Sequence, residues 1–225
     1  MCIRISMGQE INLLANYPQS KRNVKERGET KTEADRQLAR QFGREFFDGE
    51  RSHGYGGYTY HPRFWQPVVP TFVTQYGLCA GKKLLDVGCG KGFMLHDFAQ
   101  LIPGIHVSGI DISSYAISNA LETMQPYVQV ADARSLPFQE NSFDLVIAIN
   151  TIHNLELDEL KEALREIERV SRGNSFITVD AYRNAEEKEL MEAWNLTAKT
   201  ILHVDEWKSL FQSVGYSGDF YWFIP

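Results

Sequence analysis

Residues 84–92, Leu-Leu-Asp-Val-Gly-Cys-Gly-Lys-Gly, constrain this chain more than any other segment. Their apolar residues are typical of a buried strand, and that strand ends on the carboxylate of Asp86. The alternating glycines that follow predict a tight turn into a helix beginning near Phe93. Because glycine has no Cβ, a ligand can lie directly on the backbone at Gly88 and Gly90. The segment therefore predicts a ligand-binding strand–turn–helix unit.

The glycine spacing separates this unit from a dinucleotide-binding loop. That fingerprint places its third glycine three residues after the second, and this chain has Phe93 there. A pyrophosphate also prefers the bare positive end of a helix. Asp86 stands ahead of the turn instead, where it would favour a ligand that carries an ammonium group. A nicotinamide-dependent reductase is therefore disfavoured.

The chain length and the apolar content set the size of the fold. With 225 residues, of which 43% are hydrophobic, the chain is long enough for one α/β domain with a short extension. No apolar run approaches the roughly 20 residues of a membrane-spanning helix. Residues 1–8 lack the features of a secretory signal. We therefore expect no membrane association.

The cysteines and the charge bear on location and partners. The three cysteines, Cys2, Cys79 and Cys89, form no C-x-x-C pair, which suits a reducing cytoplasm and predicts no zinc site. No other His, Cys or carboxylate cluster has metal-ligand spacing, so we expect no metal. The net charge of −6 disfavours nucleic acid as a partner. The one basic cluster is interrupted by glutamates and consists of Lys21, Arg22, Lys25 and Arg27.

The first third of the chain lacks a strand pattern. Residues 1–29 predict an arm or short helix, and helices are predicted over 31–47 and 67–76. A glycine-aromatic loop over 54–62 lies between these helices. We therefore divide the chain into 1–79, with the arm, the helices and a glycine-aromatic lid, and 80–225, the ligand-binding core.

From residue 83 onward, strand and helix patterns alternate, which predicts a parallel sheet covered on both faces. The predicted strands are 83–87, 106–112, 128–131, 143–150, 175–180 and a closing strand over 219–224. The predicted helices are 93–101, 114–124, 158–170, 185–199 and 205–214.

Polar residues follow the predicted strands at the edge where an open α/β sheet holds its ligand. Asp111 closes the second strand and could accept two ribose hydroxyls, or it could cap the next helix. Asp132 and Ala133 close the third strand. They could receive the edge of an adenine ring, or Asp132 could be a turn residue. The fourth strand ends at Asn150.

These motifs together resemble the class I S-adenosylmethionine-dependent methyltransferases. The resemblance rests on D-x-G-x-G-x-G from Asp86 and on a D-A…L-P-F…S-F-D-L-V run from Asp132, and it covers about residues 80–180. It implies a Rossmann-like, doubly wound, mostly parallel sheet with S-adenosylmethionine as cofactor. The implied cofactor contacts are Asp86, Gly88, Gly90, Asp111, Ile112, Asp132, Ala133 and Asn150. The family usually closes its sheet with a strand hairpin, whereas only one closing strand is visible here.

Candidate catalytic residues come from two places. His153, after the fourth strand, could remove a proton from an acceptor hydroxyl, or it could be structural. In the glycine-aromatic loop, Tyr55 and Tyr58 could hydrogen-bond a ligand and lie over a sulfonium cation, or the loop could simply pack on the sheet. We expect the loop to fold over the methionine end of the cofactor, with His153 facing it.

The resemblance implies methyl transfer to a small polar acceptor. O-methylation in a bacterial biosynthetic pathway, polysaccharide-related ones included, is the preferred interpretation. The absence of proline after Asn150 counts against methylation of planar exocyclic amines. The alternatives are an N-methyltransferase acting on a protein or amine, and a non-catalytic S-adenosylmethionine-binding regulator. The oligomeric state is left open.

Overall fold

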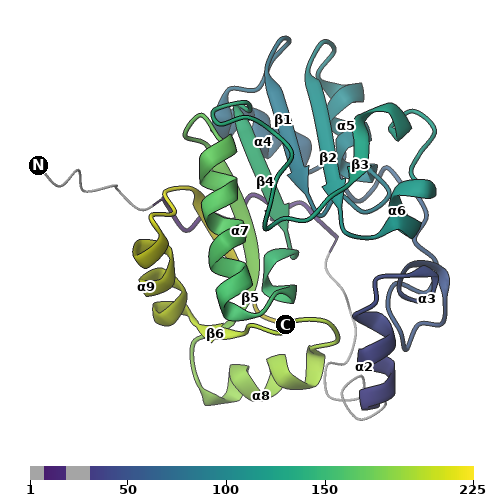
Figure 1. The fold of residues 1–225 in the computed structure, drawn as a ribbon, viewed down its shortest axis with the longest axis vertical. Coiled ribbons are helices and arrows are strands. Elements are labelled where there is room, and N and C mark those ends of the chain that lie inside the picture. Colours follow the sequence, from purple (N-terminus) through teal and green to yellow (C-terminus); the bar gives the residue numbers. More distant parts are fainter. Residues whose placement is uncertain (1–7, 19–30) are drawn as a thin grey trace, which may run out of the picture.

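The computed structural model describes residues 8–18 and 31–225, which form a seven-stranded sheet with helices around it (Figure 1). The strand order is β3-β2-β1-β4-β5, and both β6 and β7 pair with β5. Every strand pairing in the described residues is parallel. The strands are β1 (Lys83–Val87), β2 (His106–Asp111), β3 (Val128–Val130), β4 (Leu145–Ile149), β5 (Ser175–Tyr182), β6 (Leu202–His203) and β7 (Asp219–Phe223).

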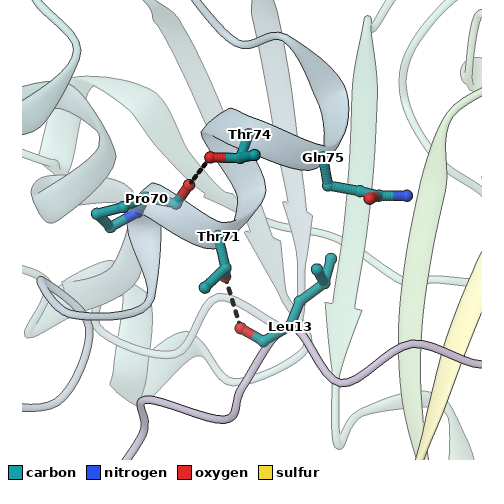
Figure 2. Close-up of a pocket in the computed structure, with 5 residues that line it drawn as sticks. All are labelled: Leu13, Pro70, Thr71, Thr74 and Gln75. Atoms are coloured by element: carbon teal, nitrogen blue, oxygen red, sulfur yellow. Dashed lines mark hydrogen bonds between the residues drawn. The ribbon is translucent and has the colours of Figure 1, made fainter.

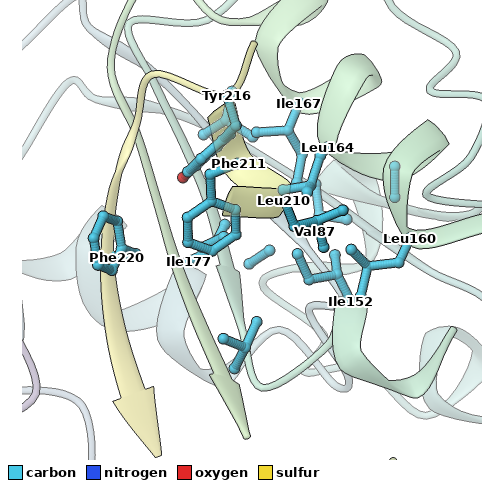
Figure 3. Packing of buried hydrophobic residues seen from close by; sticks show 14 of the residues in the cluster. Val87, Ile152, Leu160, Leu164, Ile167, Ile177, Leu210, Phe211, Tyr216 and Phe220 are labelled. Atoms are coloured by element: carbon cyan, nitrogen blue, oxygen red, sulfur yellow. The ribbon is translucent and has the colours of Figure 1, made fainter. Parts of the chain in front are cut away.

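Two helical layers cover the sheet. Helices α7 (Leu157–Val170) and α9 (Val204–Val214) pack on one face (Figure 3), whereas α4 (Val69–Tyr76) and α5 (Phe93–Leu101) pack on the other. Strands with apolar residues on both faces require such a double cover. The remaining helical elements are α2 (Glu33–Ala39), α3 (Arg44–Asp48), α6 (Ser114–Ser118), α8 (Ala185–Trp194), and two 3-10 turns at Gln125–Tyr127 and Ile152–Asn154.

The closing edge of the sheet has one long strand and no antiparallel hairpin within the described residues. β7 pairs in parallel with β5 from Phe176 opposite Asp219 to Asp180 opposite Phe223. β6, which no sequence pattern predicted, has only two residues and pairs with the end of β5 beyond β7. Outside β7, the Ile11 amide donates to the Phe220 carbonyl at 2.9 Å, so the N-terminal segment covers this edge.

Three predicted helices are shorter than expected. The helix over 31–47 is interrupted because Phe42 has a left-handed φ of 49°, and α3 starts anew after Gly43. The helix over 114–124 ends at Ser118, and the Leu121 amide then donates to the Lys91 carbonyl at 3.1 Å. The helix over 185–199 ends at Trp194, before an Asn195 side chain that hydrogen-bonds the Ala198 backbone. A hydrogen bond to a distant carbonyl therefore follows the early end of α6, and local hydrogen bonds follow that of α8.

A surface groove lies where the N-terminal segment crosses α4 (Figure 2). It is lined by Leu13, Pro70, Thr71, Thr74 and Gln75. The Thr71 hydroxyl donates to the Leu13 carbonyl at 2.6 Å, and the Gln75 amide donates to Asp219 at the amino end of β7. The groove therefore lies toward the amino end of the sheet, opposite to the end of β1 where the glycine turn begins.

Some predictions fall on parts of the chain that the structure does not describe. The basic cluster of Lys21, Arg22, Lys25 and Arg27 lies outside the described residues, as does Cys2. The predicted arm is described only over 8–18. Among the helices in the described ranges, none has the length and apolar character needed to span a bilayer.

Candidate functional site

The glycine turn follows β1 and is fastened to the end of β2. Gly88 and Gly90 have φ angles of 87° and 55°, a conformation that glycine adopts without steric cost. The Asp111 carboxylate accepts hydrogen bonds from the Gly90 and Ser113 amides, both at 2.8 Å. Asp111 thus holds the turn and also binds the start of α6, as the capping alternative predicts, while the ribose role stays a prediction.

The two glycines face different neighbours. A Cβ on Gly88 would lie 2.2 Å from the Thr151 hydroxyl oxygen, so this glycine makes room for the segment after β4. A Cβ on Gly90 would lie 3.2 Å from the ring of Tyr58. The glycine turn therefore packs against both the β4 end and the predicted lid.

Asp86 is a buried carboxylate without a partner in the described part of the chain. Asp86 is the last residue but one of β1, is 5% exposed, and accepts no hydrogen bond from residues 8–18 or 31–225. Burial, with a smaller contribution from the charge of Asp111, raises the pKa of Asp86 to about 8. A cationic ligand group at this position would stabilise the charged form.

The glycine-aromatic loop folds back on α3 beside the turn. The Tyr55 amide donates to the Phe46 carbonyl at 2.9 Å, and the Gly57 amide donates to the Phe47 carbonyl at 3.1 Å. We refer to residues 47–58 as the lid segment. In Figure 1, α2 and α3 lie beyond the carboxyl ends of the strands, and α3 lies next to α6.

The aromatic rings of the lid segment reach the glycine turn and α5. The ring centroids of Tyr55 and Tyr58 are 4.3 Å apart, and Tyr58 stacks on Phe93 at 4.7 Å. Tyr55 is 43% exposed and Tyr58 is half-buried. Loss of solvent around their hydroxyls, to which the charge of Asp111 adds, raises the pKa of both phenols. Neither hydroxyl has a hydrogen-bond partner among the described residues. Both therefore remain neutral hydroxyls that could donate to a ligand.

The backbone conformation and one close contact account for the glycines of this loop. Gly56 and Gly57 have φ angles of 68° and 103°. A Cβ on Gly54 would lie 2.0 Å from the Phe46 carbonyl oxygen. The conformation of the loop thus requires glycine whether or not the loop moves.

At the ends of β2 and β3, the surface changes from apolar to charged. Ile112 is 57% exposed immediately after Asp111. Asp132 and Ala133 are half-buried, and both Asp132 oxygens accept from Arg134 Nε at 2.9 and 3.0 Å. Hydrogen bonds from Arg134 hold the pKa of Asp132 below its usual range. Asp132 therefore already has a cationic partner, in contrast to Asp86.

The β4 end holds the other two predicted residues. Asn150 is exposed, has a left-handed φ of 51°, and accepts a hydrogen bond from the Thr178 hydroxyl at 2.7 Å. His153 is buried, and its Nδ1 accepts from the Asp180 amide at 2.9 Å. Burial lowers the pKa of His153, partly opposed by the Asp180 carboxylate. This places the proton of the neutral ring on Nε2.

The structure thus forms two groups from the predicted catalytic residues. Tyr55 and Tyr58 lie at the glycine turn, whereas His153 lies against β5. Within the described residues, no hydrogen bond or ring contact joins His153 to either tyrosine. A base role for His153 stays a prediction, and it would require the ring to give up the Asp180 amide.

Sequence reasoning missed three residues that link the lid segment to the core: Asp48, Lys91 and Tyr115. Lys91 pairs with Asp48 at 2.6 Å, and the Tyr115 hydroxyl donates to the same carboxylate at 2.7 Å. The sequence feature that could have predicted this link is the position of Lys91 between two glycines, because a long charged side chain there must find a partner outside the turn.

The comparisons with known proteins agree with this geometry. Residues 85–179 match a protein-family profile described as a methyltransferase domain. This segment belongs to that domain family, and the chain has the fold of the class I S-adenosylmethionine-dependent methyltransferases, which use S-adenosylmethionine as methyl donor. The family resemblance and the Rossmann-like fold class predicted from the motifs are confirmed.

Individual relatives differ in what they act on. The malonyl-[acyl-carrier protein] O-methyltransferase of Legionella pneumophila is 33% identical over 137 residues, which cover 59% of this chain and 47% of the relative. A tRNA (carboxymethyluridine(34)-5-O)-methyltransferase of Arabidopsis thaliana is 33% identical over 144 residues, 63% of this chain and 33% of the relative. The chain thus spans half or less of the length of these relatives.

A solved structure supports the fold. The YcgJ protein of Bacillus subtilis superposes with a TM-score of 0.52 at 21% identity, over 65% of this chain and 66% of that chain. At this identity, the likeness concerns the fold alone.

Proposed function

We propose that this protein transfers a methyl group from S-adenosylmethionine to a small polar acceptor, by O-methylation, in the cytoplasm. The observation that carries the proposal is the buried carboxylate of Asp86, which has no partner within the described residues, next to a glycine turn that Asp111 holds. A carboxylate in this state suits the ammonium group of the cofactor's methionine end. When bound, the cofactor would supply an electrophilic methyl group.

Each predicted cofactor residue has a role in this proposal. Asp111 would accept the ribose hydroxyls, and the exposed side chain of Ile112 would lie under the adenine ring. Asp132 and Ala133 would receive the adenine edge, with Arg134 fixing the orientation of Asp132. The remaining contacts would come from the backbone at Gly88 and Gly90 and from Asn150 at the end of β4.

The lid segment would close the site. Tyr55 and Tyr58 have neutral hydroxyls and electron-rich rings beside the turn, which suits contact with a sulfonium cation. We include both tyrosines in the site for this reason. The chain would accordingly divide into an N-terminal part over 1–79, which carries the lid segment, and a core over 80–225, which binds the cofactor. His153 would face the acceptor through Nε2, either as a donor or, after losing the Asp180 amide, as the base.

Two observations favour a small acceptor and O-methylation. The net charge of −6 is unfavourable for contact with a polyanion such as tRNA. The names of both curated relatives state that oxygen is methylated. N-methylation of a protein or amine, and a non-catalytic cofactor-binding regulator, remain the alternatives that product analysis distinguishes. Incubation with methyl-labelled S-adenosylmethionine and fractionated extract, read by mass, identifies the acceptor.

Cofactor binding should raise the melting temperature. With S-adenosylhomocysteine at about a hundred times its dissociation constant, mass action stabilises the folded state by about 2.7 kcal/mol. For a chain of this size, that corresponds to about 5–11 °C. Differential scanning fluorimetry with S-adenosylhomocysteine, S-adenosylmethionine and NADH measures the effect. A shift with NADH and none with the other two would overturn the proposed function.

Binding should also release a proton from Asp86. Because its pKa is about 8 in the free protein and a nearby ammonium group would lower it, the carboxyl group loses a proton on binding below pH 8. Affinity for S-adenosylhomocysteine should therefore rise between pH 6 and 7.5, by up to about tenfold per pH unit. The charge of Asp111 contributes to the raised pKa of Asp86. The pKa of the Tyr58 phenol lies well above its ordinary value, so Tyr58 keeps its proton in this window.

Calorimetric titration in buffers of different ionisation enthalpy counts the released protons. Asp86→Asn removes the titrating group and should flatten the pH profile. A profile in Asp86→Asn that is as steep as in the wild type would assign the proton to another group.

A further inference from the structure

The carboxylate of Asp48, at the last position of α3, gathers three donors from separate parts of the chain. It accepts from Lys91 Nζ at 2.6 Å, from the Tyr115 hydroxyl at 2.7 Å and from the Tyr58 amide at 2.9 Å. These donors belong to the glycine turn, to α6 and to the lid segment, respectively. One side chain thus joins the lid to both elements that flank the proposed cofactor site.

Lys91 directs its charge toward the lid segment. Lys91 is 7% exposed, and its Nζ also donates to the Tyr58 carbonyl at 2.9 Å. Tyr58 is therefore held at both its amide and its carbonyl, by Asp48 and Lys91. Its ring lies against Gly90, so a shift of its backbone would move that ring off the turn.

The Asp48–Lys91 pair is charged and partly buried. Burial alone would raise the pKa of Asp48, but the hydrogen bonds from Lys91, Tyr115 and the Tyr58 amide outweigh it and hold the pKa below its usual range. Removing either partner leaves the other charge in a poorly solvated position, which costs more than losing an exposed pair.

We propose that Asp48 is a positioning residue, which clamps the lid segment onto the glycine turn through Lys91 and so retains the bound cofactor under Tyr58. This inference rests on the proposed function for the identity of the ligand. The clamp itself is a property of the protein alone. It can therefore be tested without any ligand.

The first experiment measures opening of the ligand-free lid. Arg51 is exposed within the lid segment, so trypsin cleavage after it, followed by mass spectrometry, reports local opening. We expect Asp48→Asn and Lys91→Met each to speed this cleavage by about fivefold or more, because the charge pair is lost. The double variant should be no faster than the single variants, because both remove the same interaction.

Two matched variants serve as controls. Tyr115→Phe removes one hydrogen bond to Asp48 but keeps the ring that stacks on Phe47, so its effect should be smaller. Asp158→Asn breaks another aspartate–lysine pair, on the exposed surface of α7, and should change nothing. Additive effects of Asp48→Asn and Lys91→Met, or cleavage as slow as in the wild type, would overturn the clamp.

The second experiment measures the dissociation rate of S-adenosylhomocysteine by surface plasmon resonance. We expect about tenfold faster dissociation in Asp48→Asn and in Lys91→Met, with association rates close to the wild type. A purely structural effect would lower the melting temperature and leave the dissociation rate unchanged, which contradicts the positioning role. If the wild type fails to bind S-adenosylhomocysteine, the proposed function fails, and with it the retention role, while the trypsin result still decides whether Asp48 clamps the lid.

Discussion

Replacing Asp111 with alanine should weaken S-adenosylhomocysteine binding by about ten- to a hundredfold. The variant would lose charge-assisted hydrogen bonds to the ligand, equivalent to about 1.5–3 kcal/mol. It would also leave the buried amides of Gly90 and Ser113 without their acceptor, so that the glycine turn loses its attachment to β2. Isothermal titration calorimetry measures the affinity, and chemical denaturation measures the stability.

Asp144→Ala is the matched control for this variant. Asp144 also accepts from a backbone amide, that of Lys83 at 2.9 Å, but at the start of β1, away from the glycine turn. Both variants should lower stability, whereas only Asp111→Ala should lower affinity. If Asp111→Ala keeps wild-type affinity and only melts earlier, Asp111 is a cap and turn fastener without a ligand role.

Replacing Trp207 with alanine should destabilise the protein by about 3–5 kcal/mol, the range for large aromatic side chains in a core. Trp207 is fully buried on α9, and its Nε1 donates to the Asp180 carbonyl at 3.0 Å. The variant would open a cavity between α9 and β5 and leave that carbonyl unpaired. Urea denaturation at constant pH measures the loss of stability.

Trp207→Phe separates packing from hydrogen bonding. It keeps an aromatic ring against Phe211 and removes the indole N–H, so the expected loss is smaller, about 1–3 kcal/mol for an unpaired buried carbonyl. Because Asp180 also donates its amide to His153, this variant should disturb the β5 end more than the lid. Equal losses for both variants would show that the cavity contributes little.

Some strands and helices could be predicted from sequence because the apolar pattern of their own residues determines their bounds. The strand 83–87 and the helix 93–101 have the bounds that their apolar patterns indicate. The ends of α6 and α8 could not be predicted in this way. At the end of α6, for example, the Leu121 amide binds the distant Lys91 carbonyl, and no periodicity records such a contact.

The same distinction between local patterns and distant contacts applies to the candidate site. The positions after the strands were found because parallel strands end at one edge, which brings Asp86 and Asp111 together whatever the loops do. The link between Asp48 and Lys91 spans 43 positions and depends on how α3 packs on the core. Pairing of this kind lies beyond a single sequence because charged residues elsewhere in the chain offer equally plausible partners.

The direction of β7 has a practical consequence for measurements on this protein. Because β7 runs parallel to β5, its last residue, Phe223, lies opposite Asp180 at the edge of the sheet that carries the candidate site. Phe223 also packs on Trp194 of α8, with ring centroids 5.6 Å apart, and the chain end lies beside α8 in Figure 1. An affinity tag fused after Pro225 would emerge on the side of the candidate site, so ligand titrations call for a tag that is removed or placed elsewhere.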